Sequence, residues 1–206
     1  MRVPSKSHSL VRAALGCAMA VPLLYFGVQV LAAPFFPTFS LLTTTASDLG
    51  SPLSSQPWIA NSGALLSGLA AIVGGYGFWR GLSGMGTPAL LRGLVVLALV
   101  LAGLSNLWAG VFPLPHPLHS ANPMVVGLLL LPLLVVLALW RRADTGFRLY
   151  LGLNLLAFMV LVGFFSGAIA YDRSSFGGLM QRMLGLVCFG VIGVGAYWLL
   201  RRLEAR

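Results

Sequence analysis

Six apolar runs, separated by short segments that carry almost all of the charge, make up the pattern of this chain. Each run holds about 20 residues, the length that an α-helix needs to cross the ~30 Å hydrocarbon core of a bilayer. A helix also pairs its backbone polar groups internally, as the bilayer core requires. The pattern therefore predicts an all-α polytopic membrane bundle, with residues 1–206 forming one domain. The predicted transmembrane helices are residues 13–33, 59–79, 93–112, 123–140, 149–171 and 183–200.

The first run also resembles a cleaved signal peptide, because Arg2, Lys6 and Arg12 precede it. The apolar region of a signal peptide is usually about 7–15 residues long. The run at 13–33 is longer and lacks a clear small-x-small cleavage site, so we predict a retained helix.

Composition excludes a soluble domain of this length. Hydrophobic residues make up 58% of the chain and charged residues 8%, whereas a soluble domain carries about 25% charged residues. The formal net charge of +9 is spread between apolar runs and does not follow one polar face, as nucleic-acid binding would require. We therefore expect these residues to be membrane anchors, and we expect no nucleic-acid partner.

The basic residues lie mostly on one side of the predicted membrane. Only Arg173 and Arg182, of 13 lysines and arginines, fall on the side opposite the two chain ends. Loops rich in Lys and Arg stay in the cytoplasm, so we expect cytoplasmic termini in a multi-pass protein of the cell membrane. The residues of the cytoplasmic side are Arg2, Lys6, Arg12, Arg80, Arg92, Arg141, Arg142, Arg148, Arg201, Arg202 and Arg206.

The outer loops hold the chemistry-bearing side chains that lie away from the cytoplasm. These are Asp48, His116, His119, Asp172, Arg173 and Arg182. A six-helix bundle gathers its outer loops at one mouth, so we expect a shared site there. The competing interpretation is that polar residues are simply tolerated best outside the membrane. The longest outer segment, residues 34–58, contains four prolines and should form an irregular lid.

Short motifs in these loops resemble the family called domain of unknown function 998. The resemblance covers nearly the whole chain, and it implies a six-helix membrane protein of bacteria or archaea. It also implies a remote similarity to Frag-like and DRAM-like membrane proteins, some of which act in lipid handling. The matching positions are Ser47, Leu49, Gly50, Asn61, Gly110, Phe112, Pro113, either His116 or His119, Gly178, Leu179 and Arg182.

The chain departs from the family pattern at Gln181, where the resemblance predicts Glu. If that acid is the catalytic group of the family, this chain lacks it.

A metal-dependent membrane hydrolase is one alternative, with Asp48, His116 and His119 as its candidate catalytic residues. Catalytic zinc needs three protein ligands and an open position, and only two histidines lie on this side. We therefore expect no metal and no other cofactor. Serine hydrolysis lacks support in the sequence, because no motif fixes a histidine as the base for Ser47.

A small facilitator-type transporter is the other alternative. Coupled transporters place acids or histidines inside the membrane, whereas the polar groups in these runs are neutral. They are Gln29, Ser105, Asn106, Asn154 and Ser166.

The preferred hypothesis is a polar pocket at the outer face that binds or helps remodel a lipid or other amphiphile. Arg182 is the expected anion-binding group, because its guanidinium fork matches a phosphate. A stripe of small residues, Gly63, Ser67, Ala71 and Gly75, predicts close helix packing and is also compatible with a homo-oligomer. The expected ligand-binding residues are Ser47, Asp48, Asn61, His116, His119, Arg173 and Arg182.

Overall fold

The computed structural model describes residues 6–205, and within this range the chain is helical, without strands. Six segments are long and apolar enough to cross a membrane, which confirms the predicted all-α six-helix fold. Arg2 and Arg206, counted above with the cytoplasmic side, lie outside the described range. The elements are α1 (Lys6–Ala32), η1 (Ala33–Phe35), η2 (Asp48–Gly50), α2 (Pro57–Gly84), α3 (Ala89–Val111), α4 (Pro117–Ser120), α5 (Val125–Leu139), α6 (Thr145–Ser166) and α7 (Arg173–Glu204).

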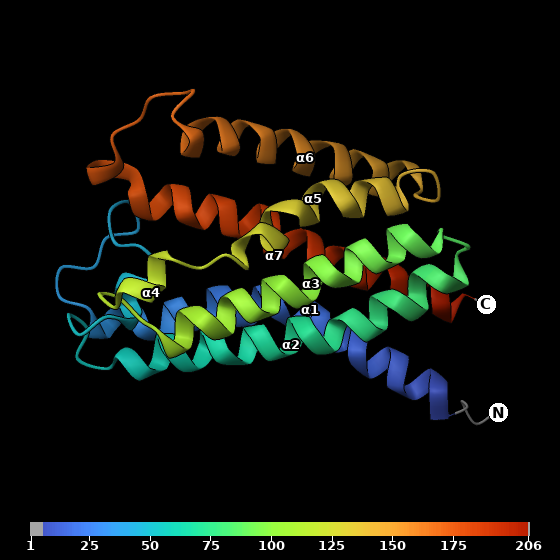
Figure 1. Ribbon diagram of the computed structural model, residues 1–206, viewed down its shortest axis with the longest axis horizontal. Helices are drawn as coiled ribbons and strands as arrows, with labels where there is room; N and C mark the ends of the chain where they lie inside the picture. The colour runs from blue at the N-terminus through green and yellow to red at the C-terminus, as the bar shows by residue number, and fades with distance from the viewer. Residues whose placement is uncertain (1–5, 206) are drawn as a thin grey trace.

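The helices lie side by side in one elongated bundle (Figure 1). Both chain ends lie at one end of it, together with the α2–α3 and α5–α6 turns. The opposite end holds the long loop after α1, the short helix α4 and the α6–α7 turn. Helix α7 packs against α1, α2, α5 and α6. The loops that carry the predicted site residues therefore meet at one end, away from the termini.

Helices α2 and α3 approach each other closely at Gly68 and Gly103. A Cβ atom added to either glycine would lie 2.6 Å from the carbonyl oxygen of the other. Real Cβ atoms do not come this close to a backbone oxygen, so only glycine fits at both positions. The predicted small-residue stripe of α2 packs against other helices of the same chain, because Gly63 contacts Val28 of α1.

Two helix ends differ from the apolar runs seen in the sequence. Helix α6 ends at Ser166, because Gly167 adopts a left-handed conformation with φ of 84°. Helix α7 begins at Arg173, ten residues before the apolar run at 183, because Asp172 accepts a hydrogen bond from the Ser174 N–H at 2.9 Å. These are the usual C-cap and N-cap signals of helices. The first turns of α7 are polar and therefore lie outside the run that hydrophobicity defines.

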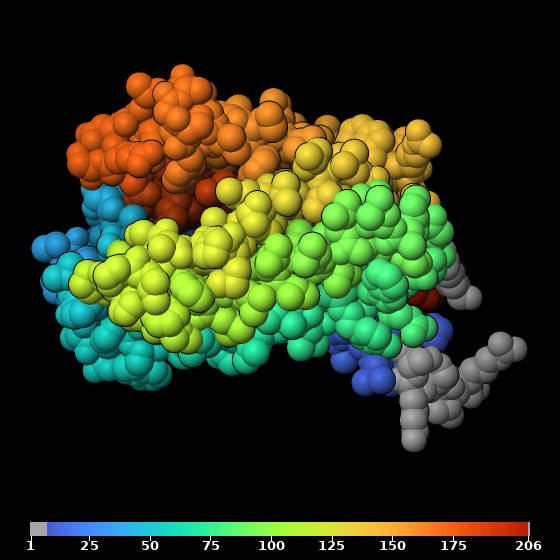
Figure 2. Space-filling view, in the orientation of Figure 1, coloured from blue at the N-terminus to red at the C-terminus, as the bar shows by residue number. Residues whose placement is uncertain are grey.

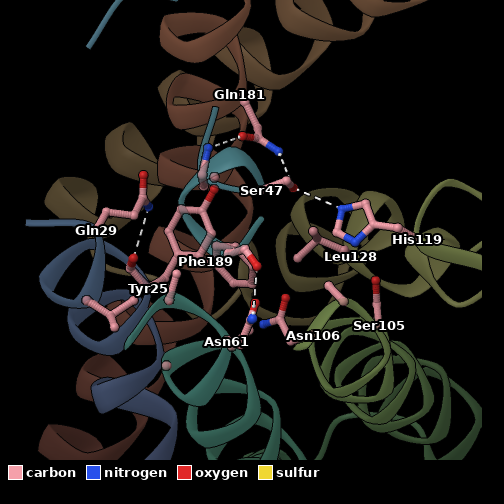
Figure 3. Close-up of a pocket in the computed structure, with 18 of the residues that line it drawn as sticks. Tyr25, Gln29, Ser47, Asn61, Ser105, Asn106, His119, Leu128, Gln181 and Phe189 are labelled. Carbon is pink, nitrogen blue, oxygen red and sulfur yellow. Dashed lines mark hydrogen bonds between the residues drawn. The ribbon is translucent and has the colours of Figure 1, made fainter. Parts of the chain in front are cut away.

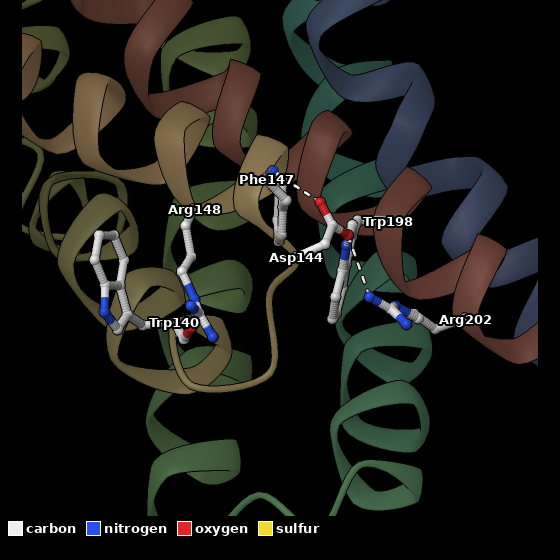
Figure 4. A network of polar contacts seen from close by, with 6 residues as sticks. All are labelled: Trp140, Asp144, Phe147, Arg148, Trp198 and Arg202. Atoms are coloured by element: carbon white, nitrogen blue, oxygen red, sulfur yellow. Dashed lines mark hydrogen bonds and ion pairs between the residues drawn. The ribbon is translucent and has the colours of Figure 1, made fainter.

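Asp144 joins α6 to α7 near the end of the bundle that holds the termini (Figure 4). One carboxylate oxygen accepts a hydrogen bond from the Phe147 N–H at 3.0 Å and caps α6. The other oxygen accepts from the Trp198 indole at 2.9 Å and from Arg202 at 3.2 Å. The Trp198 hydrogen bond is the main cause of a lowered pKa for this carboxyl group, and the Phe147 N–H contributes further.

Asp144→Ala is expected to lower the free energy of unfolding by about 1–2 kcal/mol, because it removes a helix cap and the partner of Trp198. Since the pKa is lowered in the folded protein, this stabilisation is present at neutral pH and is lost as the pH falls through the folded pKa. Thermal unfolding in detergent at neutral and acidic pH measures it. The control is Glu204→Ala, which removes only an exposed ion pair with Arg12 and should change stability by less than about 1 kcal/mol. A loss for Asp144→Ala that stays constant on acidification would contradict this account.

Candidate functional site

A cavity of about 230 Å³ lies within the bundle at the end that holds the loops. Helices α1, α2, α3, α5 and α7 form its walls, and residues 46–50 and α4 cover it. Figure 3 shows that polar side chains from several elements surround the cavity. They are Gln29, Ser47, Asn61, Ser105, Asn106, His119 and Gln181.

Ser47 and His119 are in direct contact at the cavity, 72 positions apart in the chain. The Ser47 hydroxyl oxygen lies 3.0 Å from Nε2 of His119 and 3.4 Å from the side-chain nitrogen of Gln181 (Figure 3). Ser47 stands at the N-cap position of η2, yet its hydroxyl makes no capping bond. The hydroxyl is therefore committed to the histidine and the amide.

A backbone carbonyl orients the His119 ring. Nδ1 of His119 lies 2.8 Å from the carbonyl oxygen of Phe112. A carbonyl oxygen only accepts hydrogen bonds, so Nδ1 carries the proton and donates it. In the neutral ring Nε2 then carries no proton, and it accepts a hydrogen bond from the Ser47 hydroxyl.

Gln181 is a site residue that the sequence marked only as a departure from the family pattern. Its side-chain oxygen accepts a hydrogen bond from the Ala46 N–H at 2.6 Å, and its nitrogen donates to Ser47. The first turns of α7 therefore set the position of the loop around Ser47. The departure from Glu was the available signal, and it fell on a residue that contacts the predicted serine.

Asn61 and Gly50 explain part of the loop motif. The Asn61 side-chain nitrogen donates to the Gly50 carbonyl at 3.0 Å. A Cβ atom on Gly50 would overlap the side-chain oxygen of Asn61, so a larger residue there would displace the Asn61 side chain. Leu49 is fully buried beside Ala32 and Ala60. The motif thus fixes the loop on top of α1 and α2.

The side-chain oxygen of Gln29 is a buried polar atom without a hydrogen-bond partner in the described structure. Its side chain is only 6% exposed and lines the cavity. The nitrogen donates to the Tyr25 carbonyl at 2.9 Å, while the oxygen accepts no hydrogen bond from any described residue. A buried polar atom left unpaired costs about 1–3 kcal/mol.

Four of the predicted site residues, Arg182 included, do not line the cavity. The Asp48 carboxylate accepts a hydrogen bond from the Thr45 N–H at 2.7 Å and stabilises the loop turn. His116 is exposed and caps α4 by accepting from the Leu118 N–H. Arg173 is exposed and donates to the Phe165 carbonyl at 3.3 Å. Among residues 6–205 there is no group of three or more His, Cys, Asp or Glu side chains that could hold a metal ion.

Arg182 holds the loop between α1 and α2 by hydrogen bonds and does not line the cavity. One guanidinium nitrogen donates to the carbonyls of Thr44 at 2.6 Å and Leu41 at 3.0 Å. The guanidinium lies 5.6 Å from the centre of the Phe39 ring. Its other terminal nitrogen is buried without a partner in the described structure. The structure therefore brings Ser47, Asn61 and His119 together at the cavity and leaves Arg182 beside it.

One wall of the cavity is apolar and faces α6. Leu128 and Leu184 line the cavity and also pack against a buried apolar cluster of α6 and α7. Val125 lines the cavity beside Leu128 and is 41% exposed. Figure 2 shows a recess between the start of α5 and α6, with α7 visible in it. The cavity therefore has a polar cover and an apolar side.

Comparison with known proteins gives a family and no relative of known function. The family described as "Protein of unknown function (DUF998)" matches residues 19–198. Neither the curated proteins nor the solved structures give a match. The matched segment contains every residue that lines the cavity. The chain belongs to the DUF998 family, as its loop motifs predicted.

Proposed function

We propose that this membrane protein binds a lipid or other amphiphile in the cavity. The polar head contacts Ser47, Asn61, His119 and Gln181, and the apolar part lies along Leu128 and Leu184. The observation that carries the proposal is the division of one cavity into a polar cover and an apolar wall. Pockets for small molecules have this composition, with a few placed polar groups in a mostly apolar lining.

The size of the cavity supports a ligand that is only partly enclosed. Its volume of about 230 Å³ is below the ~300–1,000 Å³ typical for drug-sized ligands. A membrane amphiphile would place its head and the first part of its chain inside. The remainder of the chain would pass Val125, where the lining is exposed, into the surrounding hydrocarbon.

The cavity would open on the outer side of the cell membrane. This assignment rests on the basic residues, most of which lie at the end of the bundle that holds the termini. The cytoplasm then faces that end, and the covered cavity faces outward. A ligand of the outer leaflet reaches it without crossing the membrane.

Gln29→Leu is expected to reduce the fraction of protein carrying a co-purified amphiphile roughly tenfold, because it replaces a polar side chain of the cavity lining with an apolar one. The unliganded protein should be as stable as the wild type or more so, since a buried unpaired oxygen is lost. Native mass spectrometry in mild detergent measures the bound fraction, and thermal unfolding measures stability. Gly27→Ala is the matched control, because a Cβ atom there meets nothing within 4 Å.

The proposal fails if the wild-type protein carries no amphiphile after mild extraction. It also fails if Gln29→Leu carries as much as the wild type and Gly27→Ala.

A further inference from the structure

The contact between Ser47 and His119 has the arrangement of a nucleophile and its base. In serine enzymes a hydroxyl donates to a histidine nitrogen, and a third group holds the other ring nitrogen. Here the hydroxyl lies 3.0 Å from Nε2, and the Phe112 carbonyl lies 2.8 Å from Nδ1. The third group is a backbone carbonyl, which fixes the same tautomer that a carboxylate would. No sequence motif pairs His119 with Ser47, because 72 positions separate the two residues.

The surroundings of this pair suit a reaction with a bound molecule. Both side chains line the cavity and are only half-buried, so a ligand in the cavity can touch the hydroxyl. The Ser47 hydroxyl makes no capping bond within its own turn. A hydroxyl at this position normally stabilises the turn that it precedes. The Ser47 hydroxyl is directed to the cavity and not to its own turn, and helix capping does not explain this direction.

We propose that Ser47 is a nucleophile and His119 its general base, and that they act on a carboxylic ester of the bound amphiphile. This inference rests on the proposed function, because the amphiphile must place its ester beside Ser47. An ester group lies where the head of an acylated amphiphile meets its chain. Ser47 belongs to the polar cover of the cavity, and Leu128 and Leu184 line its apolar wall, so an ester between head and chain would lie within reach of the hydroxyl.

The reaction is a hydrolysis, and water is its only co-reactant. The Ser47 oxygen bonds to the ester carbonyl carbon, and its proton passes to Nε2 of His119. The bond to the alcohol oxygen then breaks, and that oxygen takes the proton from Nε2. Water next gives a proton to Nε2 while its oxygen bonds to the acyl carbon. The Ser47 oxygen leaves the acyl group and recovers the proton, releasing a carboxylic acid.

Gln181 is a positioning residue for the nucleophile. Its amide nitrogen donates toward the Ser47 oxygen, so the hydroxyl proton is directed to His119. Its oxygen holds the Ala46 N–H and with it the loop. A glutamate here would keep the bond to Ala46 but would present a second acceptor to the hydroxyl. That acceptor would compete with His119 for the proton.

An alkyl fluorophosphonate tests the proposal in the detergent-solubilised full chain. We expect a single phosphonyl adduct on Ser47 in the wild type, located by peptide mass spectrometry. Ser47→Ala should carry none. His119→Ala should react at least about 10²-fold more slowly, the usual contribution of a general base. Gln181→Glu should also react more slowly. Ser55→Ala is the control, since its exposed hydroxyl donates to the Phe35 carbonyl and does not line the cavity, and it should react like the wild type.

Native mass spectrometry of the same wild-type preparation separates the two proposals. No adduct on Ser47 in folded protein that still carries an amphiphile would overturn the reaction and leave the binding function. Absence of both adduct and amphiphile would overturn both. An equal labelling rate for wild type and His119→Ala would show that Ser47 reacts without its base, which also overturns the proposal.

Discussion

Gly103→Ala is expected to destabilise the protein by about 1–3 kcal/mol, because the added methyl group meets the Gly68 carbonyl oxygen of α2 at 2.6 Å. The obstacle is backbone, which cannot rotate away as a side chain can. The two helices must separate, and the contacts on both sides of the crossing loosen with them. Gly93→Ala, on the same helix, meets nothing within 4 Å. It should be neutral or stabilising by up to about 1 kcal/mol, since alanine favours the helix over glycine.

Thermal unfolding in a single detergent compares these two variants directly. The chemical change is the same in both, so the difference between them reports on the crossing alone. Gly68→Ala should behave like Gly103→Ala, because the close contact is reciprocal. Equal midpoints for Gly103→Ala and Gly93→Ala would show that α2 and α3 do not touch at this point.

Arg182→Ala is expected to lower the free energy of unfolding by about 2 kcal/mol, because two loop carbonyls lose a charged donor. The carbonyls belong to Leu41 and Thr44, and the loop that they hold covers the cavity. Arg182→Lys keeps the charge but not the planar fork, so it should recover only part of the loss. Hydrogen exchange of residues 38–46 should rise in both variants and most in Arg182→Ala.

Arg173→Ala is the matched control for this experiment. It removes an arginine from the same helix, but its side chain is exposed and makes one longer bond to a carbonyl. Its effect should stay within about 0.5 kcal/mol. If Arg182→Ala leaves the exchange of residues 38–46 unchanged, Arg182 does not hold the loop.

Hydrophobicity predicted the six helices because the bilayer imposes one requirement on all of them: each must be about 20 apolar residues long. Helix ends follow other rules. Asp172 caps α7 with a side-chain bond that hydrophobicity does not measure, and Gly167 ends α6 through its backbone conformation. The short helix α4 begins at Pro117, in a loop between two of the predicted transmembrane helices.

The site was predictable where it depended on loop motifs and unpredictable where it depended on side-chain direction. Ser47, Asn61 and His119 carry the motif and line the cavity. His116 has the same chemistry three positions away, but its ring nitrogen is used to cap α4. Gln29 was identified as one of several neutral polar groups inside the membrane. Only the packing of its neighbours shows that its oxygen is left without a partner.

The loop over the cavity depends on contacts with the start of α7, and these contacts set an order of assembly. The bond from Ala46 to Gln181 spans 135 positions, and the bond from Arg182 to Thr44 spans 138. During synthesis the ribosome therefore completes most of the chain before the loop meets these partners. The four intervening membrane helices enter the bilayer first, and during that time the loop lacks its contacts with α7. A nascent chain that stops before α7 has the helices of a membrane protein but no closed site.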